Sequence, residues 1–272
     1  MSGRRCTVVS FHAHPDDEAL LTGGTLAKAA AEGHRVVLVT ATAGEQGLAA
    51  SYDGRGEVLA ATRGRELEES ARALGVSRLV VLGHPDSGLH PPGSRVFATM
   101  DVEELARELA ALLEEERADV LTVYDRNGGY GHPDHVQVHR VGIRAAELAG
   151  TPVVLQATVS AGLYRAALRL LAPVAARLGL VAPLGTAEVF CTGREITHRV
   201  DVRGQLVAKR AAMSAHASQR RADGRPRAMA QFLRLPGPVF ALVFGREWFA
   251  QLGAPGGTRH PDIFTSVPVR QD

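Results

Sequence analysis

The feature that most constrains this chain is a regular alternation of short apolar runs with longer helical patterns through its first half. The runs are rich in β-branched residues and have the length of buried strands: Thr7–Phe11, Val36–Thr40, Leu79–Leu82, Val120–Tyr124 and Val153–Ala157. The segments between them carry apolar residues at helical spacing: Ala19–Glu32, Val58–Leu74, Val102–Arg117 and Pro133–Leu148. This order predicts an α/β fold with a mostly parallel sheet and helices on both faces.

The rest of the chain is less regular. Gly162–Leu178 has helical spacing, although Pro173 interrupts it. A strand is expected over Ile196–Val202 and a helix over Gln205–Ala217, while the apolar Pro236–Phe249 is expected to pack against the body of the protein. Because no repeat or clear linker divides the 272 residues, we expect a single domain. Residues 1–159 would form its core and residues 160–272 a C-terminal cap of helices and strands.

Charge and hydropathy narrow the choice of partners. The 31 basic and 29 acidic residues leave a formal net charge of only +2, so no strong field exists to recruit nucleic acid. No apolar stretch approaches the length of a membrane-spanning helix. We therefore expect a cytoplasmic protein that binds no nucleic acid and has no integral membrane segment; a homo-oligomer is compatible with the sequence.

Polar clusters follow the predicted strands at the points where they end. His14-Pro15-Asp16-Asp17-Glu18 comes after the first strand, and Tyr130-Gly131-His132-Pro133-Asp134-His135 comes after the fourth. Gly44-Glu45 follows the second strand and His84-Pro85-Asp86-Ser87-Gly88 the third. Because ligands bind outside the carboxyl ends of parallel strands, these clusters are expected to meet at one edge of the sheet.

The residue types in the two main clusters suit a metal-dependent hydrolase. Two histidines and a carboxylate can hold a divalent metal, which leaves a carboxylate and a histidine for proton transfer. Adjacent Asp16 and Asp17 diverge in a tight turn, so one could bind the metal while the other faces a metal-bound water. His135 could bind from the first helical turn, while His132 would remain free to be protonated and to face developing negative charge.

Two further histidines are expected to have structural positions. His139 lies one turn beyond His135, but the glutamate of a His-Glu-x-x-His motif is absent, so we expect a histidine on the helix surface. His12 alternates with His14 along the first strand and is expected to be packed or hydrogen-bonded.

The paired motifs Ala13-His14-Pro15-Asp16-Asp17-Glu18 and Gly131-His132-Pro133-Asp134-His135 resemble those of the LmbE-like or PIG-L family of zinc-dependent de-N-acetylases. The resemblance covers about the first 150 residues and continues through Lys209–Met213 and His216–Gln219. It implies a Rossmann-like fold.

The resemblance also implies the metal site and the base. It assigns one Zn²⁺ ion, with Fe²⁺ as an alternative, to His14, Asp17 and His135. It makes Asp16 the general base that later returns a proton to the departing amine.

Residues that face the substrate are implied in the same way. His132 would stabilise the oxyanion, and Tyr130 matches a tyrosine that assists there in the mycothiol-pathway deacetylase. Arg63 and Glu66 match an Arg-x-x-Glu element on the substrate side, as does Asp86 in Asp-Ser-Gly.

The activity that the resemblance implies is removal of the N-acetyl group from a small-molecule sugar substrate, an N-acetylglucosamine-containing small molecule or conjugate, which releases acetate and a free amine. One alternative is an amidase that cleaves a mycothiol S-conjugate with the same chemistry. Another is a non-haem iron oxygenase, because two histidines and a carboxylate also form its facial triad. A third is a non-catalytic sugar-binding protein, although binding alone would need neither Asp16 nor His132.

Overall fold

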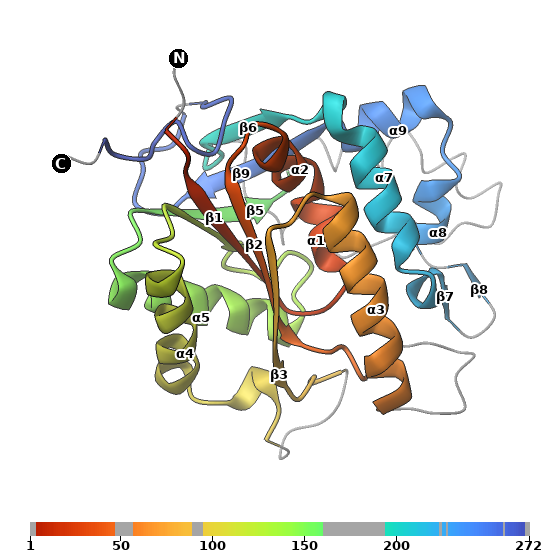
Figure 1. Cartoon of the computed structure of the whole chain (residues 1–272), viewed down its shortest axis with the longest axis horizontal. Helices are drawn as coiled ribbons and strands as arrows, with labels where there is room; N and C mark the ends of the chain where they lie inside the picture. Colours follow the sequence, from red (N-terminus) through yellow and green to blue (C-terminus); the bar gives the residue numbers. More distant parts are fainter. Residues whose placement is uncertain are drawn as a thin grey trace.

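A seven-stranded sheet with the order β3-β2-β1-β4-β5-β9-β6 forms the centre of the molecule (Figure 1). Its first five strands in the chain are β1 (Thr7–His12), β2 (Arg35–Thr42), β3 (Arg78–His84), β4 (Val120–Tyr124) and β5 (Val153–Thr158). These five strands are parallel to their neighbours among them. The predicted parallel sheet is confirmed, and β1 lies near its middle.

The structure is a computed structural model and describes residues 4–46, 57–88, 95–159, 194–222, 225–226, 228–257 and 259–269. The helix predicted over Gly162–Leu178 lies outside these residues. Among the described residues, no helix has the length and apolar character needed to cross a membrane.

Helices cover both faces of the sheet, as predicted (Figure 1). The main ones are α2 (Gly23–Ala31), α3 (Glu57–Ala73), α4 (Val102–Glu115), α5 (Pro133–Ala149) and α7 (Leu206–Ala215). Successive strand residues point to opposite faces: Val9 and Phe11 join the apolar cluster under α4 and α5, whereas Val8 packs with Leu26 of α2. β1, β2, β4 and β5 are therefore buried on both sides, which explains their continuous apolar runs, whereas the edge strand β3 is only partly buried.

The helix predicted over Ala19–Glu32 is wrong as a single element. The chain forms α1 (Asp17–Leu21) and then α2, with a break at Thr22. The backbone N–H groups of Gly24 and Thr25 donate to the two carboxylate oxygens of Glu247 at 2.8 and 2.7 Å. A carboxylate at this point satisfies the free N–H groups of a new helix N-terminus.

The C-terminal part extends the same sheet. Its elements include β6 (His198–Asp201), the short strands β7 (Arg221–Ala222) and β8 (Arg225–Pro226), α8 (Ala228–Leu233), α9 (Gly237–Phe244) and β9 (Arg246–Gln251). The strand and helix expected around residues 196–217 are confirmed. The apolar Pro236–Phe249 segment packs against the body as expected and contains α9 and the first four residues of β9, which pairs antiparallel with both β5 and β6.

A buried ion pair fixes α7 against the first two helices. Lys209 Nζ lies 2.5 Å from Glu247 Oε1 and donates to the Leu20 carbonyl at 2.8 Å. Both charged side chains are buried. Because Glu247 also binds the start of α2, this pair brings the residues that follow α7 close to the end of β1.

Candidate functional site

The two motif segments meet at the carboxyl ends of β1 and β4. The ring centroids of His14 and His132 are 4.8 Å apart, those of His132 and His135 are 5.1 Å apart, and those of His14 and His135 are 5.5 Å apart. These three histidines offer ring nitrogens that all lie within 4.8 Å of one another, so they could share a metal ion. His14 and His135 are about 120 residues apart in the sequence. The parallel pairing of β1 with β4 brings them together.

His135 is oriented as a metal ligand would be. Its Nδ1 donates to the carbonyl of Gly128 at 3.2 Å, which leaves the lone pair on Nε2. Nε2 is buried, has no hydrogen-bond partner among the described residues, and lies 3.3 Å from Asp17 Oδ2. Gly128 has a φ of 66°, and a Cβ there would lie 2.7 Å from the amide nitrogen of Val136. This position therefore needs glycine.

Asp17 joins the histidines through one oxygen. Its Oδ2 lies 3.3 Å from His14 Nδ1 and 3.3 Å from His135 Nε2, and it accepts a 2.8 Å hydrogen bond from the hydroxyl of Tyr124. Burial opposes ionisation, but the neighbouring His135 and His14 outweigh it and hold the pKa of Asp17 well below its usual range. An ionised carboxylate beside histidine nitrogens suits a divalent cation.

His14 has carboxylates on its far side. Its Nε2 lies 3.1 Å from Asp134 Oδ2 and 3.4 Å from Asp86 Oδ1. Burial alone would lower the pKa of His14, but its hydrogen bonds to Asp134, Asp17 and Asp86 raise it well above the usual value. The two carboxylates favour a proton on Nε2, which leaves Nδ1 free to bind a metal on the Asp17 side. His14, Asp86 and Asp134 also form a second group that could hold a cation.

The surroundings of His132 favour the neutral imidazole, in contrast to the protonated form expected from the sequence. Burial and the nearby His14 and His135 lower the pKa of His132 to about 4. Its Nδ1 accepts a 3.2 Å hydrogen bond from the backbone N–H of Asp134, so the imidazole caps α5. In the neutral imidazole with Nδ1 as acceptor, the proton lies on Nε2, from which His132 can donate a hydrogen bond.

Asp16 occupies a strained turn between β1 and α1. Its φ of 113° and ψ of −27° are unusual for a residue with a side chain. Burial, reinforced by the charge of Asp17, raises the pKa of Asp16, although the Arg63 guanidinium 3.6 Å away opposes the shift. A raised pKa suits a general base that must later give its proton back.

Arg63 and Glu66 make their contacts within the protein. Both side chains are buried on α3. Arg63 donates to the carbonyls of Pro15 and Gly44, and the two carboxylate oxygens of Glu66 accept from the N–H and hydroxyl of Ser218 at 2.7 and 2.6 Å. In this structure the pair supports the loops around the site and does not project from them.

The other two residues expected on the substrate side, Tyr130 and Asp86, differ in their exposure. Tyr130 is 43% exposed, with its ring 5.0 Å from that of His135, so it lies at the rim of the site. Asp86 is buried and accepts hydrogen bonds from the backbone N–H groups of Gln46 and Gly88. Asp86 thereby ties the loops after β2 and β3 together beside His14.

The sequence reasoning missed several residues of the site. Tyr124 was assigned only to a buried strand, and Asp134 received no role although it lies within a motif. Glu18 has no role in the sequence analysis beyond its place in the first motif, but it is buried and lies 2.7 Å from His216 Nε2. Burial lowers the pKa of His216 and raises that of Glu18, but their attraction outweighs both effects and gives opposite net shifts. Ser218, beside this histidine, was also missed.

Two expectations about histidines outside the site agree with the structure. His12 is buried, with its Nε2 2.9 Å from Ser10 Oγ and 3.0 Å from Thr22 Oγ1. His139 is half-buried, donates to the Tyr124 carbonyl at 3.0 Å, and belongs to neither group of candidate metal ligands in the described part of the chain.

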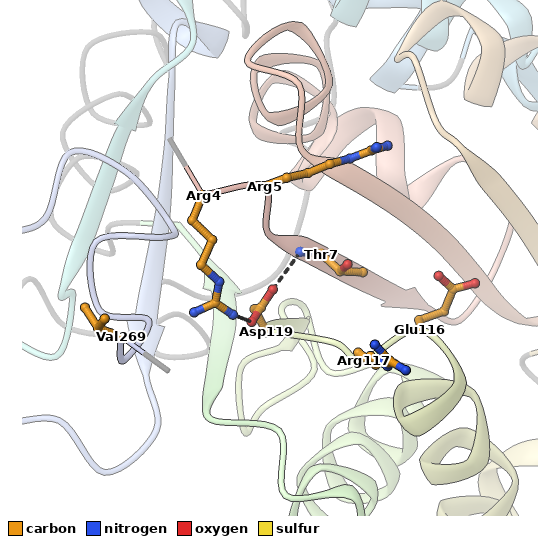
Figure 2. Close-up of a pocket in the computed structure, with 7 residues that line it drawn as sticks. All are labelled: Arg4, Arg5, Thr7, Glu116, Arg117, Asp119 and Val269. Carbon is orange, nitrogen blue, oxygen red and sulfur yellow. Dashed lines mark hydrogen bonds and ion pairs between the residues drawn. The ribbon is translucent and has the colours of Figure 1, made fainter. Parts of the chain in front are cut away.

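A pocket of about 540 Å³ lies at the opposite edge of the sheet, near the amino ends of β1 and β4 (Figure 2). Figure 2 shows Arg4 reaching toward Asp119, whose carboxylate also accepts the N–H of Thr7 at 2.9 Å. Arg5, Glu116, Arg117 and Val269 complete the lining, which carries both basic and acidic side chains. Asp119 joins the segment before β4 to the start of β1 through these bonds, and the pocket lies apart from the histidine cluster.

Comparisons with known proteins agree on the family. The PIG-L family, described as GlcNAc-PI de-N-acetylase, matches residues 9–146. The chain is 38% identical to a 1D-myo-inositol 2-acetamido-2-deoxy-α-D-glucopyranoside deacetylase of Streptomyces griseus, over 100% of this chain and 92% of that protein.

Solved structures share the fold at lower identity. The N,N′-diacetylchitobiose deacetylase of Pyrococcus horikoshii aligns with a TM-score of 0.61 at 21% identity, covering 90% of this chain and 83% of that one. The 4-carboxy-2-hydroxymuconate hydratase of Pseudomonas putida aligns with a TM-score of 0.57 at 15% identity, covering 94% and 99%. Because the fold also carries a hydratase, the assignment depends on the sequence matches. On these matches the chain belongs to the PIG-L family of de-N-acetylases and is an amide hydrolase.

Proposed function

We propose that this protein hydrolyses the acetamide of N-acetylglucosaminyl-inositol with the help of one bound zinc ion. The observation that carries the proposal is the meeting of His14, Asp17 and His135 beside the strained, half-buried Asp16. The family membership supports an acetamide as the bond that is cleaved. The chain is 38% identical along its full length to a deacetylase named for an inositol-linked N-acetylglucosamine substrate, and this supports the proposed substrate.

We assign the metal to His14, Asp17 and His135. The two 3.3 Å contacts of Asp17 Oδ2 match the separation of about 3.3 Å between neighbouring ligand atoms of a tetrahedral zinc site with bonds of about 2.0–2.1 Å. Each ligand also has a supporting partner: Asp134 for His14, Tyr124 for Asp17, and the Gly128 carbonyl for His135.

His132 is the competitor for Asp17 in this set, since one of its ring nitrogens lies within 4.8 Å of nitrogens of His14 and His135. We favour Asp17 because the His132 Nδ1 is already occupied by the Asp134 N–H. The remaining nitrogen of His132 then carries a proton and cannot bind a cation.

A zinc ion in this site would polarise the acetamide carbonyl and lower the pKa of a bound water to about 7. Asp16, held at the turn before the Asp17 ligand, accepts the proton from the attacking water. Its raised pKa lets the same carboxyl group pass that proton to the nitrogen of the departing amine. Acetate and a free amino sugar are the products.

The chain also supplies donors for the developing oxyanion. The Nε2–H of neutral His132 would provide one hydrogen bond, and the hydroxyl of Tyr130, whose ring lies 6.0 Å from that of His132 at the exposed rim, would provide another. Donors set in place before the reaction stabilise the transition state without reorganisation. Arg63 and Glu66 hold the surrounding loops, through Pro15 and Ser218, and in this way shape the sugar site.

The test is acetate release by zinc-loaded protein from N-acetylglucosaminyl-inositol, N-acetylglucosamine and a mycothiol S-conjugate. We expect acetate and free amine from the inositol conjugate at the highest kcat/KM. Release of a mercapturic acid would favour the amidase alternative, and turnover that needs dioxygen would restore the oxygenase.

Asp16→Asn provides the matched control, since it preserves shape and leaves all three ligands intact. Loss of a general base typically costs about 10²- to 10⁴-fold in rate. Full activity in this variant would refute the assignment of the base. Sugar binding with no turnover in the wild-type protein would instead favour the non-catalytic alternative.

A further inference from the structure

The conformation of Asp16 needs support from its surroundings. A non-glycine residue at φ 113° costs on the order of 1–3 kcal/mol and persists only where the structure enforces it. The backbone N–H of Asp16 donates to Glu18 Oε2 at 2.9 Å. This bond spans the turn that separates the proposed base from the proposed ligand Asp17, so it fixes the direction in which the Asp16 side chain leaves the backbone.

Glu18 is in turn held by two donors from distant parts of the chain. Its Oε1 accepts from Ser70 Oγ of α3 at 2.5 Å and lies 2.7 Å from His216 Nε2, which follows α7. Glu18 and His216 are both 0% exposed. Neither side chain can therefore contact a substrate, and loss of either donor would leave a buried carboxylate free to turn.

The segment after α7 makes a second contact with the same region. Ser218 occupies both oxygens of Glu66, three residues along α3 from Arg63, whose guanidinium holds the Pro15 carbonyl beside Asp16. His216 and Ser218 lie well beyond residue 146, where the family match ends. The C-terminal cap is thus linked to the Asp16 turn by two sets of contacts, one through His216 and Glu18 and the other through Ser218 and Glu66.

We propose that His216 is a positioning residue for the reaction: its hydrogen bond to Glu18 holds the carboxylate that fixes the Asp16 backbone, and so aims the general base. The inference rests on the proposed function, in which Asp16 is that base. On this proposal the C-terminal cap helps to position the general base. His216 contacts Glu18, and Glu18 accepts the backbone N–H of Asp16.

Two substitutions separate the hydrogen bond from other effects. His216→Leu removes the donor and keeps a side chain of similar bulk, while the amide nitrogen of His216→Gln can take the place of Nε2. Loss of a buried hydrogen bond to a charged group is worth about 1.5–3 kcal/mol, so we expect kcat to fall about 10- to 100-fold in His216→Leu. KM and zinc content should stay within about twofold, and His216→Gln should recover kcat to within about threefold.

The control is His198→Leu, which removes another fully buried histidine of the cap. His198 bonds to Thr197 and Ser266, away from the site. We expect it to lower stability without lowering kcat. An equal fall of kcat in both leucine variants, or no rescue by glutamine, would overturn the proposed role.

A double substitution of His216 and Asp16 tests most directly whether His216 acts through the base. Because His216 acts through Asp16, adding His216→Leu to Asp16→Asn should change the residual rate by less than about twofold. The same loss in both backgrounds would show that His216 acts by another route and would overturn the inference. Ser70→Ala, which removes the second donor to Glu18 Oε1, should lower kcat less than His216→Leu and provides a variant if the latter fails to fold.

Hydrogen exchange at the Asp16 amide tests the inference without any substrate. Exchange should be faster in His216→Leu than in the wild type, and unchanged in His198→Leu, because only the former releases Glu18. Equal protection in all three proteins would contradict the inference. If the wild type fails to release acetate yet this difference appears, the proposed function fails while the positioning contact stands.

Discussion

Replacement of Tyr124 by phenylalanine should weaken metal binding without touching any proposed ligand. Tyr124 is buried inside β4, and its ring stacks on His135 with centroids 4.0 Å apart and an interplanar angle of 4°. Its hydroxyl accepts the N–H of Ala13 at 3.0 Å and donates to Asp17 Oδ2 at 2.8 Å. Phenylalanine keeps the ring and its packing and removes only these two bonds.

The magnitude follows from the two bonds. The buried Ala13 N–H would lose its acceptor, which costs about 1–3 kcal/mol of stability. Asp17 would lose the group that orients it, and such losses typically lower metal affinity about 10- to 100-fold. The kcat of the zinc-saturated variant should remain within a fewfold of the wild-type value, because Tyr124 faces the ligand and not the substrate.

Urea unfolding of the apo-protein and zinc competition with a chromophoric chelator measure the two effects separately. Tyr130→Phe is the matched control: Tyr130 lies at the exposed rim, so its loss should lower kcat and leave zinc affinity and stability nearly unchanged. Wild-type zinc affinity in Tyr124→Phe would refute the reasoning, as would equal effects of the two substitutions on metal binding.

Other predictions concern stability. Burial lowers the pKa of His198 to about 4 from its ordinary 6.5. As the pH falls below 6.5, this histidine therefore takes up a proton in the unfolded chain before it does so in the folded protein. The free energy of unfolding should be unaffected by protonation of His198 above pH 6.5 and should fall by up to about 3 kcal/mol as the pH approaches 4. Urea unfolding at pH 7 and 4.5 should show a smaller pH dependence in His198→Gln, and equal dependence would contradict this. Gly142→Ala would place a Cβ 2.4 Å from Val123 Cγ1 and should destabilise the protein by about 1–3 kcal/mol; an unchanged thermal midpoint would contradict this packing. Lys209→Met should cost about 3–5 kcal/mol in urea unfolding, because it leaves the buried Glu247 carboxylate without its cation; a cost below 1 kcal/mol would show that the pair is not essential.

The parts of the fold that could be predicted are those determined by local patterns. The five parallel strands and the helices α3, α4 and α5 follow from apolar periodicity, and Pro133 and Gly150 at the two ends of α5 mark its limits. The break between α1 and α2 could not be predicted in the same way, since the group that caps α2 is Glu247, more than 200 residues away. The same holds for β9, whose pairing with β5 is a long-range contact.

The site divides along the same line. The motifs identified the side chains that gather at the ends of β1 and β4, because parallel strands bring their carboxyl ends to one edge. The groups that orient those side chains could not be predicted from the sequence. Tyr124 reads as one more apolar residue of a strand, and the contact of Glu18 with His216 joins positions 198 residues apart. No spacing rule can predict such a pair.

The most direct test of the account is the position of the metal. Anomalous scattering at the zinc edge, from crystals of the zinc-loaded protein, would locate the ion without reference to activity. We predict a single peak bonded to His14, Asp17 and His135, with Asp16 and His132 beside it but not bonded. A peak between His14, Asp86 and Asp134, or one in which His132 replaces Asp17, would contradict the account.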